Sequence, residues 1–148
     1  MAASSIIAAI ADEVAEAING QSWAESFTAC RTFRTVKRKE DLEGKMLIEV
    51  LPRGQKRKRL NRGYWQVWPT VVVGITAPID EQNSERQADH YNGVADDIAN
   101  FLQHRTFTLG YLDELEEAPT YHPQRLDLDG VFTRAIVLTF GGRAAYGN

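Results

Sequence analysis

The clearest alternation of hydrophobic and polar positions lies between Tyr64 and Ala77. Every second position from Trp65 onward is apolar, whereas the intervening positions mix polar, aromatic and small residues. This period of two predicts a β-strand with one buried face and one partly exposed face. Because Pro69 cannot donate a ladder hydrogen bond, we expect the strand to bulge there or to lie at a sheet edge. A long edge strand is a surface on which a neighbouring subunit can pair.

Two other segments have the period of an amphipathic helix. The first is expected to run from Ser4 or Ser5 to about Asn19 and to stop at Gly20. The second is expected to run from Ser84 to about His104. Gly93 lies inside the second helix, which it weakens slightly while permitting close packing.

Shorter alternating runs, bounded by turn residues, predict the remaining strands. Pro52 is expected to end the strand before it, and Asp129-Gly130 to form the turn before the last strand. In that last strand Arg134 shares a face with large apolar residues. The predicted strands are Phe27 to Val36, Met46 to Leu51, Thr106 to Tyr111, Leu126 to Leu128 and Val131 to Phe140.

The order helix, strands, helix, strands predicts an α+β fold. We expect a mainly antiparallel sheet, with the N-terminal helix and the second amphipathic helix packed on it. The 148 residues suit a single domain, 1–148, in which 141–148 is expected to be a flexible C-terminal tail. Neither a membrane-spanning segment nor a signal peptide is expected, and the one cysteine, Cys30, fits a reducing compartment.

Charge is segregated along the chain although the net charge is only −3. Residues 1–30 carry −4, residues 31–62 carry +8 and residues 63–148 carry −7. Such a division predicts complementary faces for self-assembly or one face turned toward an anion.

The most concentrated positive charge lies in a predicted loop between two strands, 53–62, which contains no acid. The loop can be a solvated connection, or it can contact nucleic acid, a neighbouring subunit or another acidic partner. Aromatic residues just after it, Tyr64, Trp65 and Trp68, would allow base stacking, although the alternation already explains Trp65 as a core residue. The basic candidates are Arg53, Lys56, Arg57, Lys58, Arg59 and Arg62; a candidate acidic intersubunit patch is Asp113, Glu114, Glu116 and Glu117.

Catalytic signatures are absent from the sequence. It has no nucleophile elbow, phosphate-binding loop, dinucleotide fingerprint or zinc-protease motif. Cys30 is expected to be buried and inert, and we expect no enzyme, no cofactor and no bound metal. The histidines lack metal-ligand spacing, and two pairs of aspartates are more readily explained as solvated than as ion ligands. These residues are His90, His104 and His122, and the pairs Asp96 with Asp97 and Asp127 with Asp129.

The order of these parts resembles the tail terminator, or tail-completion, proteins of long-tailed bacteriophages. The similarity lies in an N-terminal helix, a charged connection within VLPRGQKRKRLNRGYWQVWPTVVVGI, the amphipathic helix NSERQADHYNGVADDIANFL, the extended PTYHPQRL and the closing strand VFTRAIVLTF. It covers most of the chain but rests on pattern and length, because the family has no invariant catalytic motif.

The resemblance implies a non-enzymatic virion protein of the phage neck, assembled in the host cytoplasm. Such proteins form homohexameric rings that cap the tail tube, stop its polymerisation and present a joining surface to the head connector or stopper protein, while DNA passes through the lumen. A cyclic ring needs two unlike complementary patches on each subunit, which the +8 and −7 segments would supply. The sequence does not decide whether the basic loop faces the lumen or a neighbour.

Three alternatives to this interpretation stay open. A head-completion or other head–tail connector protein has a similar size. A nucleic-acid-binding module would use the basic residues of 53–62. A small enzyme with an acidic metal site is the third.

Overall fold

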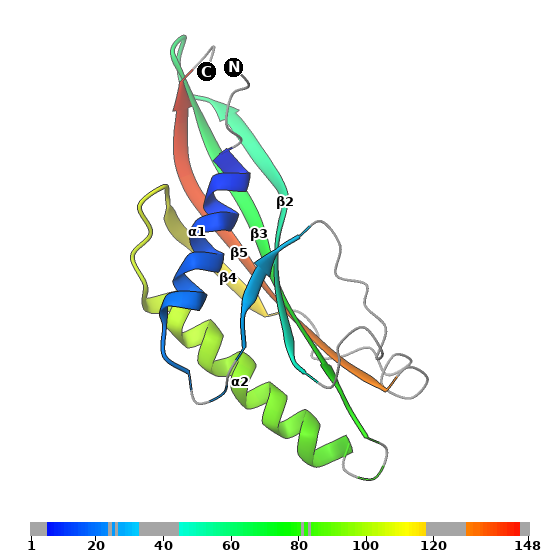
Figure 1. Ribbon diagram of the computed structural model, residues 1–148. Helices are drawn as coiled ribbons and strands as arrows, with labels where there is room; N and C mark the ends of the chain where they lie inside the picture. The colour runs from blue at the N-terminus through cyan, green and yellow to red at the C-terminus, as the bar shows by residue number, and fades with distance from the viewer. Residues whose placement is uncertain are drawn as a thin grey trace.

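The fold is a sheet with helices on one face. The computed structural model describes residues 6–23, 25, 27–32, 45–80, 82, 84–117 and 130–145, without the side chains of 84 and 143–145. Its elements are α1 (Ile6–Gly20), β1 (Ala29–Arg31), β2 (Leu47–Arg59), β3 (Tyr64–Pro78), α2 (Ser84–His104), β4 (Tyr111–Glu117) and β5 (Val131–Ala145) (Figure 1).

The described strands form a five-stranded sheet in the order β1-β2-β3-β5-β4. The short β1 runs parallel to β2, and every other neighbouring pair is antiparallel. The predicted α+β class, with its mainly antiparallel sheet and its two helices, is confirmed. Within the described residues, neither helix is both long and apolar enough to cross a membrane.

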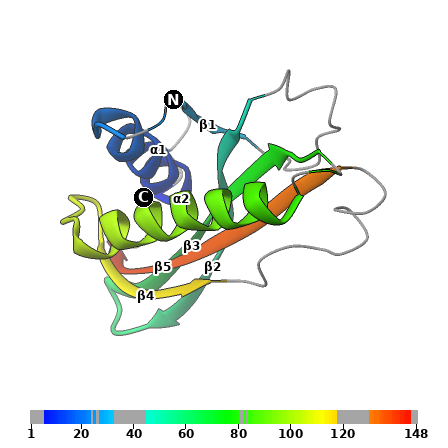
Figure 2. The same cartoon turned by 90° about the horizontal axis from the view of Figure 1, so that it is seen from below.

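Both described helices lie on the same face of the sheet (Figure 2). The core between the layers joins apolar residues of α1 and α2 to alternate residues of β2, β3 and β5. On β3 the apolar set predicted to be buried is buried from Val67 to Ala77, although Trp65 is only half-buried. The opposite face of the sheet is called here the open face, because neither helix packs on it.

The prediction that β3 could be an edge strand was wrong. It pairs with β2 on one side and β5 on the other, and so lies in the middle of the sheet. Pro69 is tolerated because it has no pairing partner in β5. The pairs on either side of it are Val67 with Gly142 and Thr70 with Thr139.

Pro52 does not end β2, which continues to Arg59. The register with β3 shifts between Pro52 and Gly54, so one additional residue, Arg53, is accommodated as a bulge. On the side of β2 that faces away from β3, pairing with β1 ends at Val50 of β2, whose partner is Arg31. A proline is compatible with this position because an edge strand does not need every N–H for pairing. The basic segment predicted as a loop is therefore mainly strand.

The predicted C-terminal tail was also wrong for 141–145, which continue β5 and pair with β3 and β4. The predicted strand from Thr106 to Tyr111 is instead an irregular turn, and β4 begins at Tyr111. The carboxylate of Glu13 on α1 holds this turn by accepting from the backbone N of Thr108 at 2.6 Å and of Leu109 at 3.3 Å. The predictions for 33–36, 126–128 and 146–148 lie outside the described residues.

Candidate assembly surfaces

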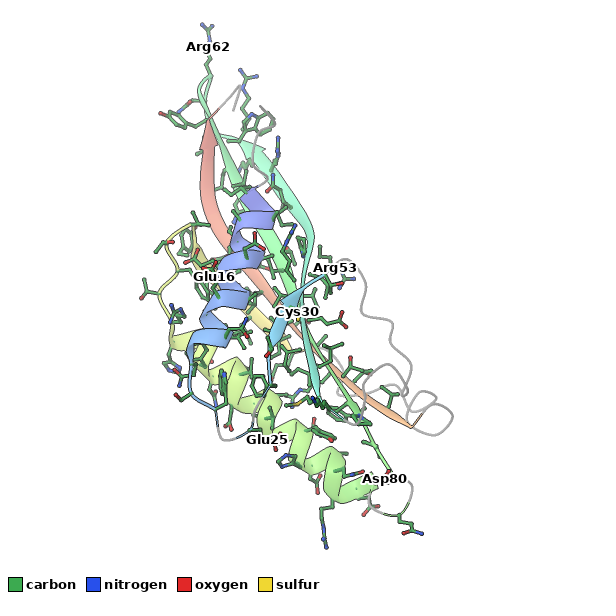
Figure 3. All side chains as sticks on the ribbon, in the orientation of Figure 1. Glu16, Glu25, Cys30, Arg53, Arg62 and Asp80 are labelled. Atoms are coloured by element: carbon green, nitrogen blue, oxygen red, sulfur yellow. The ribbon has the colours of Figure 1, made fainter. Side chains whose placement is uncertain are left out.

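The basic residues extend along the outer half of β2 and around the turn to β3. Arg53, Lys56, Arg57, Lys58 and Arg59 are exposed on β2, and Arg62 lies at the tip of the hairpin (Figure 3). Because a strand holds its side chains on two fixed faces, these charges are positioned far more firmly than they would be in a loop. This paired hairpin, 53–70, is called here the basic arm.

Register determines which basic side chains face which way. Lys56 and Lys58 pair with Trp68 and Gln66, which belong to the open face, whereas Arg57 pairs with Val67 of the helix-covered face. The Lys56 ammonium lies 5.6 Å from the centre of the Trp68 ring, a cation–π contact on the open face. Trp68 is thus half-buried beside a positive charge.

The tip of the basic arm has a defined turn. Asn61 Oδ1 accepts hydrogen bonds from the backbone N of Gly63 at 2.9 Å and of Tyr64 at 3.1 Å. Leu60 N also donates to the Tyr64 carbonyl at 3.1 Å. These local bonds hold Arg62 out at the end of the molecule.

The acidic candidates form the opposite edge of the sheet, in β4. Asp113, Glu114 and Glu116 are exposed, and the register of β4 with β5 shifts between Leu112 and Glu114. Glu114 and Glu116 pair with open-face residues of β5. The acidic stretch predicted from sequence is therefore a strand, and it lies across the sheet from the basic half of β2.

Glu117 is not purely an external acid, because it belongs to an ion cluster around Arg134. Arg134 is 8% exposed. Its Nη2 donates to Glu117 at 2.6 Å and to Asp96 at 2.8 Å, and its Nη1 donates to the carbonyl and the side chain of Asn92 at 3.1 Å. The cluster ties α2 to β4 and β5. The alternation in the sequence placed Arg134 on the same face as large apolar residues, but it did not identify the residues that neutralise its charge.

The remaining candidate ligands do not converge among the described residues, where no three His, Cys, Asp or Glu side chains are grouped as a metal site would require. Asp96 turns to Arg134, whereas Asp97 lines a pocket. His104 Nδ1 lies 2.8 Å from the Asn100 carbonyl. Cys30 is exposed on the edge strand β1, so the expectation that it is buried was wrong. His122, Asp127 and Asp129 lie outside the described part of the chain.

Sequence reasoning missed a pocket of about 330 Å³ between α2 and the connection from α1 to β1. Aromatic side chains and carboxylates both line it. A histidine of α2, His90, contacts the carboxylate of Glu25 at this pocket. The described lining residues are Trp23, Glu25, Phe27, Asp89, His90, Gly93, Val94 and Asp97.

Comparison of the chain with protein-family models finds no matching family, and comparison with curated proteins finds no matching relative.

Proposed function

We propose that this protein is a structural, non-enzymatic subunit of the neck of a tailed bacteriophage, a tail terminator that assembles into a ring. The observation that supports the proposal most is that a single sheet carries two unlike edges. The exposed basic half of β2 lies at one edge, and the acidic strand β4 lies at the other. A cyclic ring is built from such heterologous interfaces, in which one patch of each subunit binds a different patch of the next.

The directions of β2 and β4, and their positions along the sheet, are compatible with joining the two edges of neighbouring subunits. Three successive antiparallel steps from β2 through β3 and β5 to β4 make β4 run opposite to β2. A neighbour in the same orientation would therefore bring its β4 antiparallel to β2. Gly54, Thr70, Thr139 and Glu114 form one row of paired residues, so the two edges lie at the same level of the sheet.

In this proposal the ring is a homohexamer in the virion neck, assembled in the host cytoplasm. It caps the tail tube by contacting the tube protein, and it presents a joining surface to the head connector or stopper protein. DNA passes through its lumen without sequence-specific contact. We place the basic arm at the subunit interface, because a uniformly positive lumen would slow the passage of DNA.

The test is the mass of the purified protein, measured by sedimentation over a range of concentrations. We expect a species of six times the 16.6 kDa chain to grow with concentration. Arg57→Glu with Lys58→Glu should abolish that species, as should Glu114→Lys with Glu116→Lys, because each pair places like charges across the joint. An equimolar mixture of the two double variants should restore the hexamer with the two variants alternating, because a subunit with two acidic edges then meets a subunit with two basic edges on either side.

Glu85→Lys with Arg86→Glu provides the matched control, because both residues are exposed on α2, away from either edge. This exchange should leave the assembly unchanged. A protein that stays monomeric at every concentration, with no association in the mixture of charge variants, would contradict the proposal.

A second candidate function is non-specific binding of nucleic acid through the basic arm, favoured by the contact of Lys56 with Trp68. DNA mobility shifts would then weaken steeply between about 50 and 200 mM salt. Replacing Lys56, Arg57, Lys58 and Arg59 together by alanine should abolish the shift, whereas Glu114→Lys with Glu116→Lys should not.

A further inference from the structure

The pocket beside α2 is built on aromatic side chains that are fixed in place. Trp23 donates its indole N–H to the Ile18 carbonyl at 2.8 Å, which anchors the ring to the end of α1. Its ring centre lies 5.5 Å from that of Phe27 and 5.2 Å from that of Phe101. The pocket therefore offers a firm apolar wall without an unsatisfied indole donor.

Carboxylates surround this wall. Glu25, Asp89 and Asp97 line the pocket together with one imidazole, His90, and no lysine or arginine is among the described lining residues. These carboxylates would repel an anion. A neutral apolar ligand would displace water from the carboxylates without replacing the lost hydrogen bonds. A cation would satisfy both the carboxylates and the aromatic faces.

A small metal ion fits the pocket less well than a larger cation does. In the described part of the chain the carboxylates are not grouped closely enough for three of them to share one ion. A guanidinium group is larger and donates in several directions, so it can contact separated carboxylates at once.

Gly93 supplies an independent argument that something external approaches this surface. It lies within α2, where glycine is less favourable than alanine. A Cβ added at Gly93 would meet nothing within 4 Å, so no contact inside the described chain requires the glycine. A helical glycine that lines a pocket is explained if a partner comes close to the backbone there.

We propose that this pocket receives a single arginine side chain of a partner protein. The aliphatic stem would lie against Trp23 and Phe27, and the charged head would lie over Gly93 between Asp89 and Asp97, because the Glu25 carboxylate already contacts His90. The cavity, at about 330 Å³, has the size of a small ligand site and suits one such side chain. A free polyamine would leave most of its several charges outside. The pocket is separate from the β2 and β4 edges, so this inference does not depend on ring formation.

The test uses the full-length, nitrogen-15-labelled protein and the probe Nα-acetyl-arginine amide. We expect the Trp23 indole resonance to shift on titration, with a dissociation constant on the order of 10 mM, while Trp65 and Trp68 serve as internal references. The isosteric Nα-acetyl-citrulline amide, which has no charge, should shift it little. Asp89→Asn with Asp97→Asn should weaken binding about tenfold, and Asp113→Asn on β4 is the matched control.

Gly93→Ala separates a binding role from a structural one. The variant should melt at a higher temperature, because alanine favours the helix, yet bind the arginine probe at least about threefold more weakly. The proposal is overturned if citrulline amide binds as well as arginine amide, if Trp23 does not respond, or if Gly93→Ala binds unchanged. Tighter binding of spermidine than of the arginine probe would assign the pocket to a free polyamine and overturn it too.

Discussion

Glu117 on β4 accepts a hydrogen bond from Nη2 of Arg134 on β5 at 2.6 Å. The second acceptor of the same nitrogen, Asp96, comes from α2 at 2.8 Å. A charged group buried in the core is thus neutralised by two carboxylates that reach the surface, with side-chain exposures of 40% and 58%. The helix, the acidic edge strand and the last strand meet at this guanidinium.

The two sides of this cluster should respond unequally to mutation. Arg134→Met should destabilise the protein by only about 1–2 kcal/mol, because the carboxylates left behind reach water and methionine fills the apolar space. Glu117→Ala with Asp96→Ala should cost about 3 kcal/mol, because it leaves a guanidinium buried without its counter-ions. Urea unfolding followed by tryptophan fluorescence measures both, with Glu114→Ala as the exposed control. Equal costs would contradict this asymmetry.

Asn19 should act as a clamp between the end of α1 and β1. Its side chain accepts from the Ala29 N at 2.8 Å and donates to the Ala29 carbonyl at 3.0 Å. Asn19→Ala should lower the free energy of unfolding by about 1–3 kcal/mol, and Asn19→Asp by less, because aspartate keeps the acceptor. Exchange of the backbone amide hydrogen of Cys30 with solvent should be faster in both variants than in the wild-type protein. The control Gln21→Ala, at an exposed neighbouring position, should change neither the free energy of unfolding nor the exchange rate at Cys30. If the Cys30 amide exchanges as slowly in Asn19→Ala as in the wild-type protein, the clamp is refuted.

Gly141 and Tyr111 should be energetically coupled. They pair across β5 and β4, and a Cβ added at Gly141 would overlap the Tyr111 ring. Tyr111 is 58% exposed, so its ring can move aside, and Gly141→Ala should cost only about 1 kcal/mol. In a Tyr111→Ala background the same substitution should cost nothing, because alanine is then acceptable in the strand. A double-mutant cycle by urea unfolding measures the coupling, and additive costs would exclude it.

Tyr91 should make stability depend on alkaline pH. Its pKa is raised above the ordinary 10.0, first by burial and then by the carboxylates of Glu25 and Asp80. A folded-state pKa above the unfolded value gives stability that is complete below the unfolded pKa and is lost as pH rises through the folded pKa. Tyr91→Phe, which also loses the 3.3 Å bond to the Pro78 carbonyl, should be less stable at neutral pH by about 0.5–1 kcal/mol.

That deficit should shrink as the pH rises, because only the wild-type protein carries the titrating phenol at this position. Urea unfolding of both proteins from about pH 8 to about pH 11 checks this, since the unfolded tyrosine titrates near pH 10. A deficit that stays constant over this range would show that Tyr91 contributes only its hydrogen bond.

Local patterns predicted the elements well where burial is periodic. The helix from Ser84 to His104 and the strong strand at Tyr64 follow directly from spacing. The position of β3 inside the sheet did not follow, because pairing partners depend on residues distant in sequence. Pro52 looked like a strand end, yet an edge strand with a bulge accommodates it. Gly141 looked like part of a loose tail, yet its missing side chain leaves room for Tyr111.

The candidate surfaces were located by charge but not by structure. Charge alone identified the six basic and four acidic residues, and neither group could be assigned to opposite edges of one sheet without knowing the strand order. The pocket could not be anticipated, because Trp23 and Asp97 meet only after α2 folds against the connection from α1. Its one local signal was Gly93, a glycine inside an otherwise regular amphipathic helix.

The bulge at Arg53 has a consequence for how tolerant the basic arm is to change in length. Beyond it, even-numbered residues of β2 occupy the face that odd-numbered residues hold before it. Without Arg53, Gly54 could still follow Pro52 and pair with Thr70, so Lys56 to Arg59 would keep their partners on β3 and their faces. Loss of this one residue should therefore be accepted by the arm, whereas a single-residue deletion between Lys56 and Arg59 would move neighbouring charges to the opposite face of the strand.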